Sequence, residues 1–431
     1  MWRAVEQLQA TGPSGHALIS GMKANEHVAD CAASGAMSDP SVRGRHYRDV
    51  CMGKVLVPAS DTVVERSDPD ECAGEMYRAC PPEVISKRYI HNCLDRVSAF
   101  VGQGSFGAVY EATDLYTDVV VAVKVFHKKQ HPHRDIRTEE SIYAKLVQGR
   151  SSDIQLFAEV FGTGHHMGHR FIVMEMCGPT LDVLLNAEKM VPLPRRHVQE
   201  IGYQLIQGVG FLHSLGLIHT DLKPDNIALK CTGYVTYKYF DPTSGFREHR
   251  RLVSTQLCIL DLGGVVDATD LGNEGDVGAM TYRAPEVSLG MRFGYGVDTF
   301  AVGCMLAEVQ LNRPLFPYEI ADDREHLALV ERICGPFPFA FVADFEKQYP
   351  GYFHIEDDIA FVAYPGKPFN ANVHNDALCR LRCATPISTR IRDGVLSDLL
   401  RGLLRHDPSS RLTMQDALHH EFFDDLHHLR L

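Results

Sequence analysis

The residues best suited to chemistry lie in one short run, 219–226, which reads His-Thr-Asp-Leu-Lys-Pro-Asp-Asn. Asp221 can accept a hydroxyl proton, Lys223 can offset negative charge on a moving phosphoryl group, and Asn226 can ligate a metal ion through its amide oxygen. Asp and Asn are also ordinary turn formers, so each residue taken alone is compatible with a structural role. Together they predict a loop that supports phosphoryl transfer to a hydroxyl.

A further acidic residue, Asp261, follows the apolar pair Ile259 and Leu260, which is typical of a buried strand. A carboxylate at the end of such a strand suits a Mg²⁺ ion that bridges phosphates. A turn former is again the structural alternative, but this order of groups is improbable by chance. We therefore expect Asn226 and Asp261 to hold Mg²⁺.

Three glycines, Gly102, Gly104 and Gly107, are followed by Val109 in the pattern GxGxxGxV. Without side chains the backbone can approach a phosphate, and the valine can cover an adenine ring. Taken alone, glycines in a hairpin are more often structural. A dinucleotide-binding fold would need a helix directly after the glycines, whereas a second strand pattern follows here. The Rossmann interpretation is therefore excluded.

Lys124 lies in the apolar run Val-Ala-Val-Lys, residues 121–124. It is either a strand-edge lysine that reaches water or a cation for nucleotide phosphates held by an acidic partner on the next helix. Glu139 and Glu140 are both candidates for that partner. We prefer Glu139, because apolar residues three, four and seven positions later then continue one buried helix face.

Length and composition restrict the class of protein. With 431 residues, the chain has room for roughly two to three structural units. Apolar residues make up 45% and charged residues 23%, which is typical of globular proteins. The net charge of −12 argues against a broad grip on nucleic acid or anionic lipid, so basic or neutral protein partners are expected.

Twelve cysteines without paired CxxC spacing favour a reducing intracellular compartment, nuclear or cytoplasmic. The uncharged stretch 201–220 is long enough to suggest a membrane span, but its glutamines, histidines and glycines favour a buried helix followed by a loop. No membrane partner is expected.

The sequence pattern changes along the chain. Residues 1–90 lack a sustained period and are predicted to be a largely disordered N-terminal extension. Strands are expected within 97–125, a helix with Ile136, Glu139 and Leu146 on one face, and mostly helices after Pro179. A small β-rich unit followed by a larger helical one is therefore predicted.

From Gly102 to Phe423 the chain resembles eukaryotic protein kinases. Beyond the motifs above, the run 284–286 (Ala-Pro-Glu) matches the end of the activation segment, Arg411 matches the ion-pair partner of Glu286, and Asp298 matches the residue that braces the catalytic loop. The resemblance implies a two-lobed α+β protein-kinase fold over 91–424. Its boundaries are expected near 91–176 for the N-lobe and 177–424 for the C-lobe, with a tail at 425–431.

A narrower resemblance is to the LAMMER, or Cdc-like, kinases of the CMGC group. The run 325–336 (Glu-His-Leu-Ala-Leu-Val-Glu-Arg-Ile-Cys-Gly-Pro) is similar to their signature, and HTDLKPDN is similar to their HTDLKPEN. Taken alone, the first run could be an amphipathic core helix. The long insert 230–258 is also similar in size and character.

By this resemblance the chain is an ATP- and Mg²⁺-dependent protein kinase for Ser/Thr, with tyrosine as a further acceptor. Asp221, Lys223, Lys124 and Glu139 would be catalytic, Met174 the gatekeeper, and Glu175 with Cys177 the hinge. The implied nucleotide-binding residues are Val101, Gly102, Gln103, Gly104, Ser105, Phe106, Gly107, Val109, Ala122, Lys124, Met174, Glu175, Cys177 and Asp182.

The resemblance also implies a monomeric kinase domain that acts on basic or Arg/Ser-containing proteins, with no direct nucleic-acid partner. The alternative is a pseudokinase-like scaffold that binds nucleotide or partners without efficient transfer.

Several positions depart from the family pattern. Thr220 replaces an arginine that grips an activation-loop phosphate in many kinases, and residues 267–280 offer only Thr269 as a hydroxyl. With little for a phosphorylation switch to act on, constitutive activity is expected. Ala279 and Met280 replace a hydroxyl residue and an arginine near the substrate, and Leu262 replaces a phenylalanine, so catalysis is expected to be reduced or retuned.

Overall fold

The computed structural model divides the chain into two units, Met1–Arg43 and Gly44–Leu431, and every described residue belongs to the second. Most of the predicted extension 1–90 therefore lies outside the described residues. No helix in the described part of the chain is long and apolar enough to cross a membrane. The structure describes residues 84–85, 89–91, 100–103, 107–127, 136–149, 152–187, 189–241, 245–270, 275–364 and 371–429.

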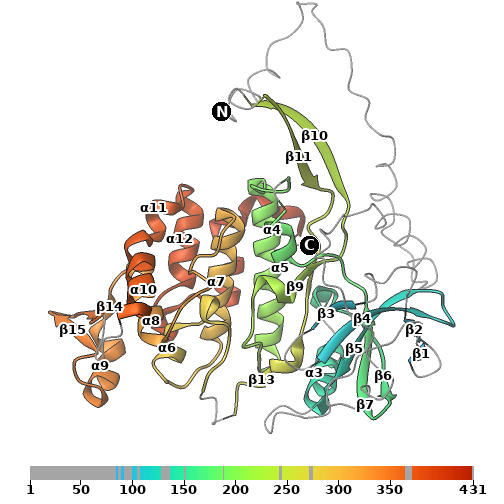
Figure 1. Ribbon diagram of the computed structural model, residues 1–431, viewed down its shortest axis with the longest axis horizontal. Coiled ribbons are helices and arrows are strands. Elements are labelled where there is room, and N and C mark those ends of the chain that lie inside the picture. Colours follow the sequence, from blue (N-terminus) through green and yellow to red (C-terminus); the bar gives the residue numbers. More distant parts are fainter. Residues whose placement is uncertain are drawn as a thin grey trace, which may run out of the picture. The chain divides into compact units, whose positions relative to one another are not determined.

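The N-lobe is a seven-stranded antiparallel sheet with one long helix (Figure 1). The strands run in the order β1-β2-β4-β5-β7-β6, and β3 pairs with β4. The β-branched run of β5 is almost wholly buried, and α3 buries Ile142 and Leu146 as the sequence pattern predicts. The elements are β3 (Phe100–Gln103), β4 (Gly107–Asp114), β5 (Val120–Phe126), α3 (Ile136–Gln148), η3 (Ser152–Leu156), β6 (Val160–His166) and β7 (His169–Glu175).

Two short strands of this sheet lie at the end of the stretch predicted to be a largely disordered extension. β1 (Val84–Ile85) pairs with β2 (Tyr89–His91), which pairs in turn with β4. The sequence did not indicate these strands, because the runs are too short to show a period and are ordered by hydrogen bonds to the edge of a sheet formed later in the chain.

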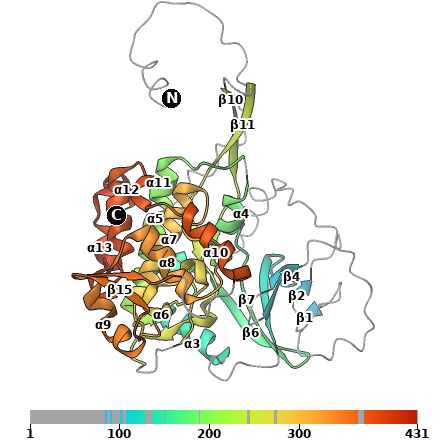
Figure 2. The ribbon, with the colours of Figure 1, turned by 60° about the vertical axis from the view of Figure 1, so that its left-hand side comes forward.

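The C-lobe is built around two buried helices, α5 and α7 (Figure 2). An added Cβ at Gly202 would lie 2.9 Å from Leu306 of α7, and one at Gly208 would lie 2.5 Å from Ile259, so these glycines permit close packing. The stretch 201–220 is therefore a buried helix and loop, as predicted. The helices are α4 (Leu181–Leu185), α5 (Arg195–Ser214), α6 (Pro285–Ser288), α7 (Gly296–Leu311), α8 (Asp323–Cys334), α9 (Phe339–Gln348), α10 (Ala371–Cys383), α11 (Ile387–Arg390), α12 (Gly394–Leu403) and α13 (Met414–Leu418).

Short strands and 3-10 turns connect these helices, so the region after Pro179 is less purely helical than expected. The insert 230–258 forms a β-hairpin, because the aromatic and β-branched residues of its first strand, together with Phe246 and His249 on the second, favour cross-strand pairing. The elements are β8 (Leu217–Ile218), η4 (Pro224–Asn226), β9 (Ile227–Leu229), β10 (Tyr234–Asp241), β11 (Gly245–Leu252), β12 (Leu257–Ile259), η5 (Leu262–Gly264), β13 (Val266–Asp267), η6 (Met280–Tyr282), β14 (Phe337–Pro338), β15 (Phe353–Glu356), β16 (Ile359–Val362), η7 (Pro408–Ser410) and η8 (Glu421–Leu429).

The end of the domain also lies later than expected. The turn η8 continues through residues assigned to a tail at 425–431, and Leu426 is fully buried in the C-lobe core. Burial of this leucine beside Phe422 and Phe423 holds the segment to the domain.

Buried ion pairs hold the C-lobe loops. Arg411 makes two 2.6 Å contacts with the carboxylate of Glu286, and both side chains are 1% exposed. The guanidinium also donates to the carbonyl oxygens of Gly296 and His406. In α8, Glu325 is fully buried and binds Arg380 at 2.6 and 2.9 Å. The run 325–333 is thus both an amphipathic core helix and an ion-pair anchor.

Two buried histidines in this lobe are held neutral. Burial lowers the pKa of His326 from 6.5 to about 3, with the charge of Arg283 acting in the same direction. Burial likewise lowers the pKa of His406 to about 4, although its hydrogen bond to the carbonyl oxygen of Gly335 opposes the shift. At these two histidines the unfolded chain therefore binds more protons than the folded one below about pH 6.5.

We predict that Arg411→Met lowers the free energy of unfolding by about 3–5 kcal/mol, because Glu286 would keep a buried charge without a cation. Urea unfolding at pH 7 measures the loss. The control is Lys347→Met, which breaks an exposed pair with Asp344 and should change stability by less than about 1 kcal/mol. Equal losses in the two variants would contradict the assignment.

A second prediction concerns acid. Stability should fall as the pH drops from 6.5 toward 4, with a slope of up to ~1.4 kcal/mol per pH unit for each buried histidine. His326→Gln should flatten this slope, measured by urea unfolding at several pH values. His354→Gln, at an exposed position, should leave it unchanged. A slope that is the same in all three proteins would refute the role of His326.

Candidate active site

A buried cluster of three charges joins the two lobes at the site. The ammonium of Lys124, on β5, lies 3.0 Å from both carboxylate oxygens of Glu139, on α3, and 2.8 Å from Asp261. Lys124 and Glu139 are 7% and 2% exposed, so neither side chain reaches water freely. Glu140 instead binds Arg170 at 2.6 Å. Between the two candidate partners of Lys124, the structure therefore selects Glu139.

The electrostatics favour the charged forms of Lys124 and Asp261, whereas burial raises the pKa of Glu139 against the opposing charge of Lys124. Burial by itself would lower the pKa of Lys124, but the charges of Glu139 and Asp261 raise it above the ordinary value. Burial acts to raise the pKa of Asp261, yet the charge and hydrogen bond of Lys124 outweigh it and lower this pKa. One ammonium and two carboxylates leave a net negative charge, which suits an added metal ion.

The catalytic candidates of the run 219–226 converge in one loop. Lys223 Nζ lies 2.8 Å from Asp221 Oδ2. Asn226 donates from Nδ2 to the backbone oxygen of Asp221 at 2.8 Å and to its carboxylate at 3.3 Å. Asp221 is partly exposed, as a group that must meet a substrate hydroxyl should be.

Backbone strain and a buried carboxylate hold this loop. Thr220 has a left-handed φ of 70°, and Asp261 has one of 58°. The carboxylate of Asp298, 1% exposed, accepts hydrogen bonds from the backbone N–H groups of His219 at 2.7 Å and Thr220 at 2.9 Å. The same carboxylate lies 3.0 Å from His213 Nε2, a contact that the motif did not indicate.

The glycine motif proves to combine two roles. An added Cβ at Gly102 would meet nothing within 4 Å, so this position is open to a ligand. At Gly107 it would lie 2.3 Å from the backbone oxygen of Val125, so this glycine is required by close strand packing. Val101 and Gln103 are exposed beside Gly102. The predicted residues Gly104, Ser105 and Phe106 lie outside the described residues.

Apolar side chains from both lobes pack into one cluster. Ala122 and Met174, directly paired on β5 and β7, are buried in it, and Val109 packs against it. The sequence interpretation missed Ala228 and Cys258, which belong to the same cluster. Its position in the sequence could have indicated Ala228, because this residue lies two positions after Asn226 in the run that continues the catalytic loop.

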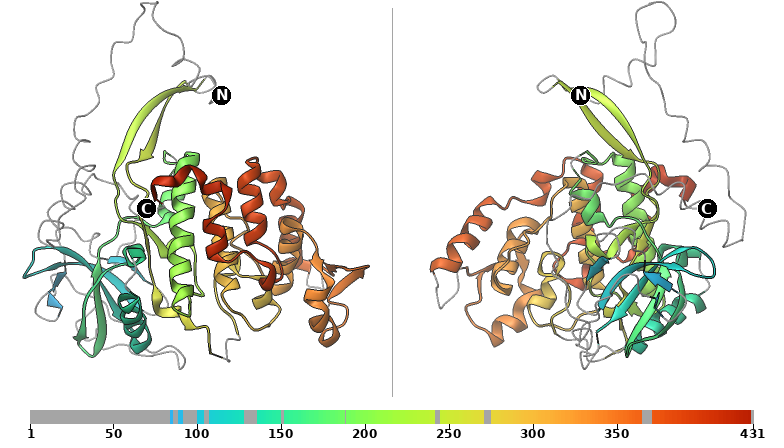
Figure 3. Two further views of the ribbon diagram at one scale, coloured as in Figure 1. Left: turned by 180° about the vertical axis from the view of Figure 1, so that it is seen from behind. Right: turned by 45° about the vertical axis from the view of Figure 1, so that its right-hand side comes forward.

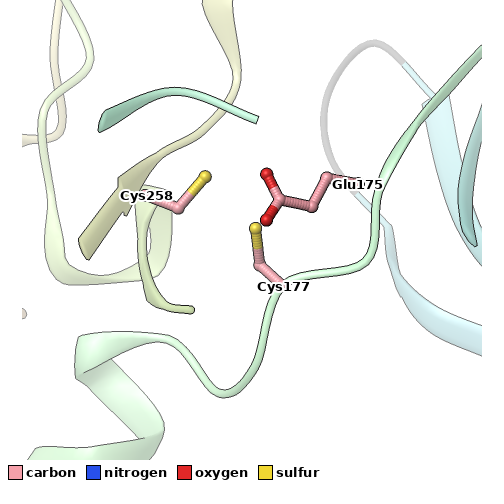
Figure 4. Close-up of side chains that lie close together, drawn as sticks. All are labelled: Glu175, Cys177 and Cys258. Carbon is pink, nitrogen blue, oxygen red and sulfur yellow. The ribbon is translucent and has the colours of Figure 1, made fainter. Parts of the chain in front are cut away.

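The hinge between the lobes carries a polar cluster (Figure 4). The carboxylate of Glu175 and the thiols of Cys177 and Cys258 face one another, with their ligand atoms within 4.8 Å. Lys230 already binds Glu175 at 2.8 Å and neutralises it. The Cys177 thiol and burial both raise the pKa of Cys258, which stays protonated at neutral pH. The N–H of Glu175 is donated to Glu159, so Glu175 can offer a ligand only its carbonyl oxygen.

Asn226 and Asp261 have suitable atoms for Mg²⁺. Because Asn226 uses its amide nitrogen to bind Asp221, its amide oxygen remains the group available to a cation. Asp261 has one oxygen on Lys124 and a second oxygen for a metal. Hard oxygen donors of this kind match Mg²⁺.

Asp182, in the first turn of α4, has its pKa raised by burial and by the charge of Asp225.

At two of the positions that depart from the kinase pattern, Thr220 and Leu262, the side chain makes a different contact in the structure. Thr220 donates through its hydroxyl to the backbone oxygen of Gly264 at 2.9 Å and is 5% exposed. Leu262 is fully buried, so the apolar contact after Asp261 is kept. Ala279 precedes the turn η6 and has no hydroxyl to offer Asp221.

Comparisons with known proteins agree with this geometry. The protein kinase domain model matches residues 96–423. Serine/threonine-protein kinase Doa of Drosophila melanogaster is 31% identical over 352 residues, which cover 80% of this chain and 40% of Doa. Dual specificity protein kinase CLK4 of Homo sapiens is 30% identical over 332 residues, covering 75% of this chain and 65% of CLK4.

Serine/threonine-protein kinase AFC3 of Arabidopsis thaliana is 31% identical over 338 residues, covering 76% of this chain and 81% of AFC3. The chain thus spans less than two thirds of Doa and CLK4 but most of AFC3. A solved crystal structure of a kinase domain superposes with a TM-score of 0.69 at 21% identity, covering 81% of this chain and 99% of that structure, which shows the two-lobed kinase fold. This chain belongs to the protein kinase family and, within it, to the LAMMER, or Cdc-like, kinases.

Proposed function

We propose that this chain transfers the γ-phosphoryl group of MgATP to Ser and Thr hydroxyls of proteins, and also to Tyr. The observation that carries the proposal is the charge cluster of Lys124, Glu139 and Asp261, which sits at the junction of β5, α3 and the segment after β12. An inert scaffold has no physical need for two carboxylates around a buried ammonium beside a catalytic loop.

In the proposed mechanism, Asp221 orients the substrate hydroxyl and takes its proton as the new oxygen–phosphorus bond forms and the bond to the leaving diphosphate breaks. Lys223, 2.8 Å from Asp221, offsets charge on the transferring group. Lys124, held by Glu139, positions the α- and β-phosphates. The transition state is loose, so positioning and charge account for most of the catalysis.

The nucleotide is proposed to lie beside the apolar cluster of Val109, Ala122 and Met174, with Glu175 and Cys177 offering hinge backbone groups. Asp182 would lie near the ribose. Asn226 and Asp261 would hold Mg²⁺, which supplies positive charge to the phosphates when bound. The glycine-rich segment would cover the phosphates.

Basic protein substrates are proposed, including Arg/Ser-containing ones. Support comes from the net charge of −12 and from the neighbouring carboxylates of Asp182 and Asp225. These two carboxylates repel each other, and a basic substrate side chain would relieve that repulsion. A monomeric domain in the nucleus or cytoplasm is proposed, in keeping with thiols such as the exposed Cys379 and Cys383, which are free.

The decisive prediction compares two adjacent glutamates. Glu139→Gln should lower kcat/KM for phosphorylation of an Arg/Ser peptide by about 100-fold, because Lys124 would lose its buried partner. Glu140→Gln, which breaks only the pair with Arg170, should stay near wild type. Asp221→Asn should abolish transfer while retaining ATP binding. Radiolabelled phosphate transfer and nucleotide-binding calorimetry provide the measurements.

Equal activity in the Glu139→Gln, Asp221→Asn and wild-type proteins would refute the catalytic roles. Nucleotide binding by the wild type without any transfer, in the presence of Mg²⁺ and several basic proteins, would instead favour the pseudokinase-like scaffold.

Activation is predicted to need no phosphorylation of the loop 267–280. Thr269 is already engaged, since its hydroxyl and its N–H bind Asp267 at 2.7 and 3.0 Å, and Thr220 leaves no arginine there to grip a phosphate. Protein made in bacteria should therefore be active, and Thr269→Ala should keep its kcat within about twofold. Inactive bacterial protein that gains activity after treatment with an upstream kinase would contradict this.

A further inference from the structure

The β10–β11 hairpin is a second exposed surface with its own chemistry. Its strands share eight residue pairs, and among the described residues neither strand pairs with any other. It extends away from the C-lobe helices (Figure 3). An isolated two-stranded ribbon is only marginally stable in water, so contacts with the rest of the chain must hold this hairpin in place.

The base of the hairpin is held to the C-lobe. Leu252 is buried, and the N–H of Arg250 donates to the backbone oxygen of Lys189 at 2.7 Å. The Lys189 ammonium lies 3.0 Å from Glu248. The guanidinium of Arg250 covers the Tyr234 ring at 4.3 Å. These contacts orient the ribbon from its base.

Strand alternation and the pairing register separate two faces. We call one the aromatic-basic face; its paired residues are Val235 with Arg251, Tyr237 with His249, and Tyr239 with Arg247. The opposite face carries Thr236, Lys238 and Phe240 with Arg250, Glu248 and Phe246. The acidic Glu248 thus lies away from the aromatic-basic face.

The aromatic-basic face is open to solvent. Tyr237 is 37% exposed and Tyr239 42% exposed, and Arg247 and Arg251 are exposed across the pair. The rings of Tyr237 and His249 meet edge to face at 5.3 Å, which holds the Tyr237 ring in place. Two exposed rings at alternate positions of one strand, with arginines opposite, form the arrangement that binds unpaired bases and phosphates.

We propose that the aromatic-basic face binds single-stranded RNA, with bases stacked on Tyr237 and Tyr239 and phosphates on Arg247 and Arg251. The overall charge of −12, which predicted no nucleic-acid partner, describes the whole chain and not this ribbon, where residues 234–252 hold four Lys or Arg and two Asp or Glu. An acidic protein would also attract the arginines, but it would offer no flat bases to stack on Tyr237 and Tyr239.

The test uses the full chain and a fluorescein-labelled oligouridine of about 16 nucleotides, long enough for a ribbon of this kind. Tyr237→Ala/Tyr239→Ala should weaken binding by about 10-fold or more, measured by fluorescence anisotropy. The matched control, Phe240→Ala/Phe246→Ala, removes two exposed rings from the opposite face and should stay within about twofold. Both variants should melt at similar temperatures and phosphorylate an Arg/Ser peptide as wild type does.

The contribution of the arginine charges to binding is tested by single substitutions on the two faces. Arg251→Gln should reduce the magnitude of the slope of log affinity against log salt by about 0.7, the value expected for one lost contact to a single strand. Lys238→Gln, on the opposite face, should leave the slope unchanged. No RNA binding by wild type, equal losses from both faces, or equally tight binding of polyglutamate would each overturn the proposal. Peptide phosphorylation is read separately, so failure here is distinguishable from failure of the proposed kinase activity.

Discussion

A lysine ammonium buried under a sheet must be neutralised, and this requirement organises the site. Lys124 meets it with two carboxylates that come from different parts of the chain, Glu139 on α3 and Asp261 after β12. Desolvation by itself would disfavour the charged form of Lys124. For this reason α3 and the segment after β12 have to bring their carboxylates within hydrogen-bond distance of its ammonium. The distance between the lobes at this point is therefore set by ion-pair contacts of 2.8 to 3.0 Å.

The same constraint recurs in the C-lobe, where each buried carboxylate has its own partners. Asp298 accepts backbone hydrogen bonds from the strained catalytic loop, Glu286 binds Arg411, and Glu325 binds Arg380. Each pair joins segments that are distant in sequence. Asp298 thus holds the loop that carries Asp221, and each of the other two pairs would be costly to break at one charge.

Two of the departures from the family pattern replace a contact with a different one. The Thr220 hydroxyl donates a hydrogen bond to the backbone oxygen of Gly264, at the position where many kinases have an arginine that binds a phosphate. Leu262 is buried in the core directly after Asp261. Both substitutions favour a loop held by permanent contacts within the C-lobe over one held by a reversible charge. The hairpin β10–β11 is not such a departure; it adds an exposed surface to the C-lobe.

Residue type and spacing were enough to predict the chemistry and the local elements, because both act over short range. It predicted the groups of the catalytic loop, the buried face of α3, and the family. The contacts of Glu139 and Glu140 agree with the preference drawn from the helix face. Only the folded structure adds β1 and β2 to the sheet, buries Leu426 and brings Cys258 beside Cys177. Each of these depends on contacts between segments far apart in the chain, whose register and distance no local pattern records.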